Sequence, residues 1–183
     1  CKIETNPSIY HLGYLIGPRI NAGGRVGKCS HGANLLLNKD PKNTFKLASE
    51  LDQYNKERQI LEKDLLQKIL NKTKNYSNDP VLILAGSNWH EGIIAIVASR
   101  LKDKFNKPVV IISLNGDEGK ASARSIIGFD IGSVIIAATQ ENILLKGGGH
   151  KMAGGFSIKA KNIEKFKNFV FRKFKNLNED LTS

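Results

Sequence analysis

The sequence is poor in the residues that build disulfide scaffolds and membrane segments. Its two cysteines, Cys1 and Cys29, are too few for a framework of disulfide bonds. No apolar run approaches the roughly 20 residues that a membrane-spanning helix requires, and residues 1–5 have neither the apolar stretch nor the cleavage site of a signal peptide. These absences argue against a secreted domain and against a membrane partner, and we expect a cytoplasmic protein.

Methionine and acidic residues are scarce as well. Met152 is the only methionine, so residue 1 is not a natural translation start, and we expect the chain to be part of a longer protein. The 17 acidic residues stand against 28 lysines and arginines, which gives a formal net charge of +11 at pH 7. This excess favours a polyanionic partner, with nucleic acid as the first candidate. A lysine-rich surface that is merely solvated is the alternative that charge alone leaves open.

The order of the apolar segments predicts an α/β fold. Asp40 and Pro41 form a helix start, and apolar residues then recur at steps of three and four to about residue 74. The wholly apolar run 81–85 is typical of a parallel strand buried on both faces, and residues 108–113 indicate a second buried strand. We therefore expect a long N-terminal connecting helix followed by a mixed, mainly parallel sheet flanked by helices. The other expected elements are strands at 119–125 and 156–159 and helices at 93–105, 130–139 and 162–175.

Two segments combine glycine with groups that can hold phosphate. Residues 17–25 are expected to form a loop in which glycine lets a ligand approach the main chain and arginines present planar donors. Residues 119–125, read as a strand, would align two cations and a hydroxyl on one face. An ordinary turn and a solvated edge strand are the alternatives. The candidate binding residues of the two segments are Arg19, Asn21, Arg25, Lys120, Ser122, Arg124 and Ser125.

Two further segments could contribute to the same site. Residues 146–155 are read as a glycine-rich turn that enters a short helix, whose backbone N–H groups could bind an anion beside His150. Residues 87–92 follow a predicted strand, where open α/β sheets usually bind ligands. Trp89 could stack on a nucleobase or could instead close the core over this turn. The candidates here are Trp89, His90, Gly148, Gly149 and His150.

No catalytic constellation accompanies these segments. The four histidines and the scattered aspartates form no Asp-x-Asp, Asp-His-His or His-Glu-x-x-His motif. A Ser-His-Asp arrangement with a nucleophile elbow is also absent, and Cys29 has no evident activating partner. We therefore expect no metal to be bound by this chain alone.

Four motifs, in this order, closely resemble the RecJ family. They are the runs Ile16–Arg25, Trp89–Arg100, Ser122–Ser125 and Gly148–Gly155. The Gly-Gly-His element alone would indicate only the wider group of DHH-associated domains, which oligoribonucleases and alanyl-tRNA synthetases share. The Gly-Pro-Arg-Ile-Asn and Trp-His-Glu-Gly runs indicate the RecJ family itself.

The resemblance implies a single-strand-specific 5′→3′ DNA exonuclease of recombination and repair that uses Mn²⁺ or Mg²⁺ held by a preceding DHH domain. It implies that residues 1–39 end that catalytic domain, 40–78 form the connecting helix and 79–183 form the DHH-associated domain. The implied partners are single-stranded DNA and the upstream DHH domain. The chain alone would be inactive. We expect a monomer, because the heptad pattern that could make the helix a coiled-coil dimer is short and interrupted by Arg58.

Motif position also implies residue roles. Ser122 and Arg124 would take the 5′-terminal phosphate, and Arg25 or Arg19 would approach the scissile phosphate. His150 would face the active-site cleft with Gly148 and Gly149, so that Arg25 and His150 are the candidate catalytic residues.

One residue departs from the family pattern, because Gly23 stands where alanine is usual, which is expected to loosen its loop. Two other functions stay open for the chain as given. They are a non-catalytic nucleic-acid-binding module and a fragment of an oligoribonuclease-type DHH phosphoesterase.

Overall fold

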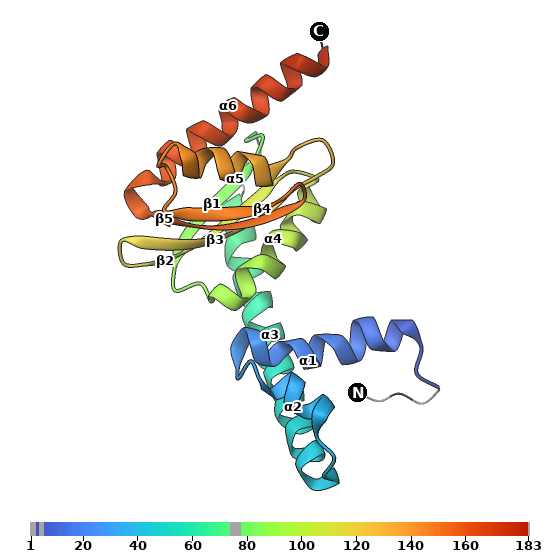
Figure 1. The fold of residues 1–183 in the computed structure, drawn as a ribbon. Helices are drawn as coiled ribbons and strands as arrows, with labels where there is room; N and C mark the ends of the chain where they lie inside the picture. The colour runs from blue at the N-terminus through green and yellow to red at the C-terminus, as the bar shows by residue number, and fades with distance from the viewer. Residues whose placement is uncertain (1–2, 4–5, 74–77, 183) are drawn as a thin grey trace. The chain divides into compact units, whose positions relative to one another are not determined.

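A computed structural model describes residue 3 and residues 6–73 and 78–182, and it divides the chain into two compact units, Cys1–Lys63 and Asp64–Ser183 (Figure 1). The first unit contains a π-helical turn η1 (His11–Ile16), α1 (Gly17–Val26), α2 (His31–Leu37) and most of α3 (Pro41–Thr73). The second contains β1 (Leu82–Ser87), α4 (Glu91–Phe105), β2 (Val109–Asn115), β3 (Glu118–Arg124), α5 (Ile131–Gln140), β4 (Lys146–His150), β5 (Ala153–Lys159), a 3₁₀ turn η3 (Ala160–Asn162) and α6 (Ile163–Thr182). None of the described helices is both long and apolar enough to cross a bilayer.

The start of α3 is confirmed as the sequence predicts. The Asp40 carboxylate accepts the backbone N–H groups of Lys42 at 3.2 Å and Asn43 at 3.1 Å, so it satisfies two donors that a helix start leaves without partners. The helix then continues to Thr73, and residues 74–77 of the expected connecting helix lie outside the described residues.

The expected glycine loop at 17–25 is wrong, because this segment is the helix α1. Gly23 is buried there, and a Cβ at this position would lie 2.7 Å from the Lys28 carbonyl oxygen and 3.3 Å from the Leu51 side chain. Glycine therefore allows α1 to pack closely against its neighbours and does not loosen a loop. The prediction failed because small residues permit close helix packing as readily as turns.

The sheet of the second unit is mixed, in the order β1-β2-β3-β5-β4. This confirms an α/β domain with a sheet flanked by helices. β1 and β2 are parallel and joined by α4, whereas the pairs β2–β3, β3–β5 and β5–β4 are antiparallel. The sheet is therefore mainly antiparallel, in contrast to the expectation. The apolar runs of β1 and β2 are buried on both faces, and that pattern does not extend to the later strands.

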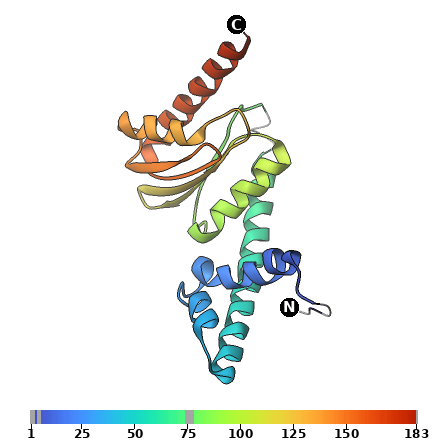
Figure 2. The same cartoon turned by 45° about the vertical axis from the view of Figure 1, so that its right-hand side comes forward.

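Helices cover the two faces of the sheet unequally. α5 and α6 pack on one face, where the core includes Ile112, Ala123 and Phe156 from the strands and Ile135 and Phe166 from the helices (Figures 1 and 2). α4 packs on the opposite face against β2 and β3. On that face, β4 and β5 carry exposed residues, so this part of the sheet is accessible to a ligand.

The glycine-rich segment 146–155 is not a turn entering a helix, as expected, but the hairpin of β4 and β5. Glycines are unfavourable in strands, so local propensity gives no indication of β4. Tertiary packing explains why glycines occupy this strand. A Cβ at Gly132 of α5 would lie 2.8 Å from the backbone carbonyl of His150, so α5 and β4 approach each other backbone to backbone. An anion-binding helix N-terminus is therefore absent from this segment.

The Asp130 cap of α5 gives a testable pH dependence. Its carboxylate accepts the Ser133 N–H at 3.0 Å, and this hydrogen bond is the main reason that the pKa of Asp130 lies below its ordinary value. A carboxyl with a lowered folded-state pKa contributes stability above its unfolded pKa of about 3.9 and loses that contribution as pH falls through the folded pKa. We expect Asp130→Ala to lower the free energy of unfolding at pH 7 by about 1 kcal/mol.

The Asp130→Asn variant separates the charge from the cap. Asparagine keeps the capping oxygen, so stability at pH 7 should change less than in Asp130→Ala. Urea unfolding of both variants and the parent at pH 7 and in acid tests this expectation. A loss of stability in acid that is equally large in Asp130→Asn and the parent would contradict a contribution from the Asp130 charge.

Candidate nucleic-acid interface

Three rows of residues cross β3, β5 and β4 on the face opposite α5 and α6. Residues that pair across neighbouring strands point to the same face, and rows two residues apart are separated by about 7 Å. The rows, each read from β3 through β5 to β4, are Arg124–Ala153–His150, Ser122–Gly155–Gly148 and Lys120–Ser157–Lys146. We call Lys120, Ser122, Arg124, Lys146 and His150 the basic face. It brings two distant sequence segments onto one surface.

Arg124 and Ser122 are coupled within β3. The Arg124 Nη1 donates to the Ser122 hydroxyl at 3.1 Å and to the Ala123 carbonyl at 2.7 Å. These bonds hold the half-buried guanidinium along the strand beside the serine. A hydroxyl that accepts one hydrogen bond can still donate another. The pair therefore places a cation and a hydroxyl donor together, which is the chemistry that a phosphate requires.

His150 lies at the other end of the Arg124 row, two strands away. Its Nδ1 accepts the Met152 N–H at 3.3 Å, so a neutral ring carries its proton on Nε2. The exposed ring points away from α5, because the His150 backbone is the part that contacts Gly132. Two strand spacings of about 4.8 Å separate the two backbones.

In the middle row, Gly155 and Gly148 expose backbone without a side chain, between the two rows that contain cations. A Cβ at Gly148 would have nothing within 4 Å, and one at Gly155 would meet only the Ala121 carbonyl oxygen at 3.4 Å. We call these two residues the glycine shelf. Because no side chain rises from the shelf, a ligand can approach the strands there between the cations of the outer rows.

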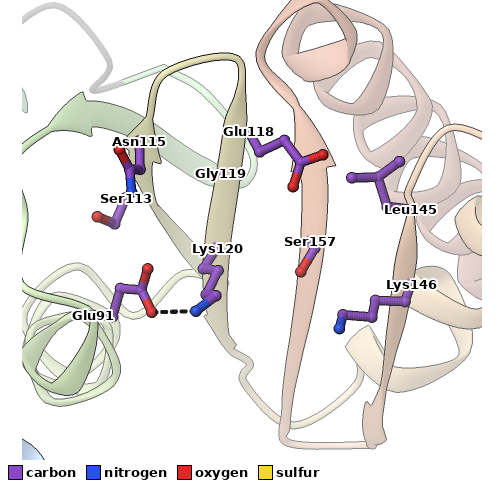
Figure 3. A pocket seen from close by; sticks show the side chains of 9 residues that line it. All are labelled: Glu91, Ser113, Asn115, Glu118, Gly119, Lys120, Leu145, Lys146 and Ser157. Carbon is purple, nitrogen blue, oxygen red and sulfur yellow. Dashed lines mark hydrogen bonds and ion pairs between the residues drawn. The ribbon is translucent and has the colours of Figure 1, made fainter.

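The third row lines a groove of about 420 Å³. Figure 3 shows Lys120 of β3, Ser157 of β5 and Lys146 of β4 on the near side of the sheet, with Lys146 extending toward Ser157. The Lys120 ammonium pairs with the Glu91 carboxylate at 2.7 Å. The other residues that line the groove are Ser113, Asn115, Glu118, Gly119 and Leu145.

Of the segment 87–92, Glu91 lines this groove. The Trp89 carbonyl accepts the Ser113 hydroxyl at 2.5 Å, and the Trp89 ring lies so close over Gly86 that a Cβ there would clash with it. The ring therefore packs over the turn, which agrees with the alternative of a closed core. The exposed His90 caps α4, since its Nδ1 accepts the Gly92 N–H at 3.1 Å.

The candidates of the first unit lie in α1. The Arg19 Nε pairs with Asp52 at 2.7 Å, and its Nη1 donates to the Leu15 carbonyl at 2.7 Å. The hydrogen bond from Arg19 to the Asp52 carboxylate is the main reason that the pKa of Asp52 lies below its ordinary value, and the hydrogen bond from Lys56 is the second. Arg19 therefore has a structural partner. Asn21 is exposed and Arg25 is half-buried on the same helix.

Two predicted residues do not belong to the basic face. Ser125 is 1% exposed, and its hydroxyl donates to the Phe129 carbonyl at 2.6 Å, so it fixes the loop after β3. Gly149 pairs with Gly154, a register that directs it toward α5. If residues 146–150 are read as a strand, Gly149 points to the opposite face from Gly148 and His150 and is excluded from the basic face. The sequence of this segment does not indicate a strand.

Lys146, Ser157 and Gly155 also belong to this surface and are not among the residues predicted from the sequence. Two signals could have found them. Lys146 lies two residues before Gly148, and Gly155 lies two residues before Ser157, which is the period of one strand face. Both signals become readable only when 146–150 and 153–159 are known to be strands.

The described residues do not fit a metal ion. Among residues 3, 6–73 and 78–182, no group of three or more His, Cys, Asp or Glu side chains could hold one. The basic face consists of donors and cations, which bind anions.

Comparison with known protein families matches residues 78–176 to the DHHA1 domain. The chain is 37% identical over 164 residues to the single-stranded-DNA-specific exonuclease RecJ of Haemophilus influenzae, which covers 85% of this chain and 28% of that protein. It is 33% identical over 155 residues to RecJ of Bacillus subtilis, covering 83% of this chain and 20% of that protein. The chain thus spans less than a third of the length of these curated relatives.

Solved structures of RecJ proteins are similar to this chain as well. RecJ from Thermus thermophilus in complex with Mn²⁺ matches with a TM-score of 0.80 and 31% identity, covering 91% of this chain and 24% of that one. A structure of exonuclease RecJ bound to manganese matches with a TM-score of 0.81 and 30% identity, covering 94% of this chain and 43% of that one. The similarity therefore includes both units of the chain and is not limited to the DHHA1 domain.

Proposed function

Because this chain belongs to the DHHA1 domain family and is similar to RecJ exonucleases over most of its length, we propose that it is part of a single-stranded-DNA-specific exonuclease. In this proposal the chain supplies residues that bind the phosphates of a 5′ DNA end. An upstream DHH domain would hold Mn²⁺ or Mg²⁺ ions, which would activate the water that hydrolyses the phosphodiester bond. Residues 1–39 would end that domain, 40–78 would connect the two, and 79–183 would be the DNA-binding domain.

The alignment of Arg124 and Ser122 with the glycine shelf and His150 carries the proposal. A terminal phosphate dianion that sits on the shelf can accept hydrogen bonds from the Ser122 hydroxyl and from the Arg124 guanidinium. His150, with its proton on Nε2, is a further donor at the same end of the sheet. In the full enzyme, Arg25 or Arg19 would approach the scissile phosphate. His150 would face the active-site cleft. Lys120 would add a phosphate contact, whereas Trp89 and His90 would border the strand.

The chain by itself is expected to bind DNA without cutting it. No described group of side chains can hold a metal ion, and hydrolysis needs an activated water. A non-catalytic nucleic-acid-binding module remains the second candidate, since the same basic face serves either function. The two differ in whether the full-length protein carries Asp-His-His metal ligands upstream, which its reading frame reveals.

The Arg124→Ala variant tests the assigned 5′-phosphate contact. We expect the affinity for a 5′-phosphorylated single strand to fall about tenfold, because a charge-assisted hydrogen bond is lost, while the affinity for a 5′-hydroxyl strand changes much less. Fluorescence anisotropy with strands labelled at the 3′ end measures both affinities across a salt series.

Arg172→Ala is the matched control, since it removes the same charge from an exposed residue of α6, on the other side of the sheet. This variant should keep the preference for a 5′ phosphate. An equal loss on both strands in Arg124→Ala, or the same loss of preference in Arg172→Ala, would remove the role given to Arg124.

A further inference from the structure

We propose that Ile127, in the loop between β3 and α5, contacts the nucleobase of the 5′-terminal nucleotide of the bound strand. The inference rests on the proposed function and deepens it, because it adds a contact for the base to the contacts for the terminal phosphate. An isoleucine side chain makes no hydrogen bonds, so it can pack against any of the four bases. Ile127 therefore adds affinity for the strand end without a sequence preference.

The position of Ile127 in the chain is the first argument. Ile127 is 93% exposed, the largest value of any large apolar residue that the structure describes. Single exposed apolar residues are common on protein surfaces, so exposure alone does not indicate a ligand. Ile127, however, follows Arg124 by three residues, and their Cα atoms can be at most about 11 Å apart. A nucleotide whose phosphate is bound by Arg124 can therefore reach Ile127 with its base.

The path of the strand is the second argument. In the proposed function the terminal phosphate lies on the glycine shelf, and the strand continues past the row of Arg124 and His150 toward the active-site cleft. The loop 125–130 begins at the end of β3, directly beyond that row. Ile127 thus lies on the side of the shelf to which the strand runs, whereas the groove lies on the other side.

The third argument is that hydrogen bonds anchor the loop at both ends. The Ser125 hydroxyl donates to the Phe129 carbonyl at 2.6 Å, and the Ser125 N–H donates to the Met152 carbonyl at 2.9 Å. The Phe129 side chain is buried in the core. Gly128 has a φ of +97°, a conformation that favours glycine and lets the chain turn back directly after Ile127. Because the loop is already ordered, a base that packs on Ile127 costs little conformational entropy.

The neighbours of Ile127 suit an uncharged base better than a phosphate. Met152, in the turn between β4 and β5, is 39% exposed and supplies a second apolar side chain at this end of the sheet. Asp130 is the only acidic residue of the loop, and its carboxylate accepts the Ser133 N–H as the cap of α5. The charge of Lys151, in the same turn as Met152, acts on that carboxylate and offsets it.

The test is a double-mutant cycle between Ile127 and the terminal base, in the full 183-residue chain. The probes are 5′-phosphorylated oligothymidylates labelled at the 3′ end, with all bases present, with an abasic 5′-terminal nucleotide, or with an abasic interior nucleotide. By fluorescence anisotropy, the parent should bind the terminally abasic strand about fivefold more weakly than the intact strand, the lower end of the range for a base contact. Ile127→Ser should bind the intact strand about fivefold more weakly and should no longer distinguish it from the terminally abasic strand. The interior abasic nucleotide should have the same effect on both proteins.

Two further variants complete the test. Ile127→Leu keeps an apolar side chain of the same volume, so it should retain the sensitivity to the terminal base. Ile136→Ser makes the same change as Ile127→Ser at a residue of α5 that is 46% exposed, on the other side of the sheet from the basic face. This control should bind all three strands as the parent does. Thermal melting confirms that each variant is folded.

The outcomes separate this inference from the proposed function. If Arg124 governs the 5′-phosphate preference but Ile127→Ser binds the three strands like Ile136→Ser, the base contact is wrong and the proposed function stands. If Ile127→Ser removes the sensitivity to the interior abasic nucleotide instead of the terminal one, the assignment to the 5′-terminal base is wrong. If Ile127 governs the sensitivity to the terminal base but no 5′-phosphate preference exists, the base contact stands and the phosphate assignment is wrong.

Discussion

Replacing Gly149 by alanine is expected to destabilise the second unit by about 3 kcal/mol and to detach β4 from the sheet. A Cβ at this position would collide with the Ala153 carbonyl oxygen and lie 2.6 Å from the Gly154 Cα. Both are backbone atoms of β5, so a side chain cannot move aside to relieve the contact. The two strands must separate, and Lys146 and His150 then leave the basic face. Urea unfolding, together with DNA binding, measures both effects.

The Gly148→Ala variant is the matched control for this prediction. It makes the same chemical change on the neighbouring residue of the same strand, but a Cβ there meets nothing within 4 Å. Its free energy of unfolding should stay within about 0.5 kcal/mol of the parent. Its methyl group would rise from the glycine shelf, so DNA binding can weaken without a loss of stability. Equal unfolding midpoints for the two variants would contradict the close approach of β4 and β5.

Phe166→Ala is expected to lower the free energy of unfolding by about 4 kcal/mol. The Phe166 side chain is fully buried, and its ring centroid lies 4.7 Å from that of Phe156 on β5. Truncation leaves a cavity between α6 and the strand that carries Gly155 and Ser157 on its other face. Differential scanning calorimetry should show a lower melting temperature for the second unit.

Phe45→Ala serves as the comparison, because the Phe45 side chain is 78% exposed on α3. The same truncation there removes little buried area and should change stability by less than about 0.5 kcal/mol. A small effect of Phe166→Ala, similar to that of Phe45→Ala, would mean that α6 does not close the core of this unit.

The sequence predicted those elements whose formation depends on local patterns. The Asp40 cap, the runs of β1 and β2 and the helices 93–105 and 130–139 follow from capping chemistry and apolar periodicity, and the structure contains them all. The direction of β3 and β5 could not be predicted in the same way. Strand direction depends on which edge of the sheet the chain reaches, and residues close in sequence do not encode this.

The candidate site was predictable where a period of two was visible. Lys120, Ser122 and Arg124 lie on one face as expected from their spacing. The segment 17–25 and the strand β4 were misread for one physical reason. Glycine removes the side chain whose periodicity would reveal a helix or strand, and its role at Gly23 and Gly149 is set by the distance to another segment.

The register of β3 with β5 has a consequence for how this surface could change. A shift of β3 by one residue relative to β5 would place Lys120 and Arg124 in the hydrophobic core and expose Ala121 and Ala123 to solvent. The main chain thus fixes the spacing of the backbone positions that carry these charges. Swapping one outward side chain for another leaves this spacing intact, whereas inserting or deleting a residue in β3 would erase the entire pattern at once.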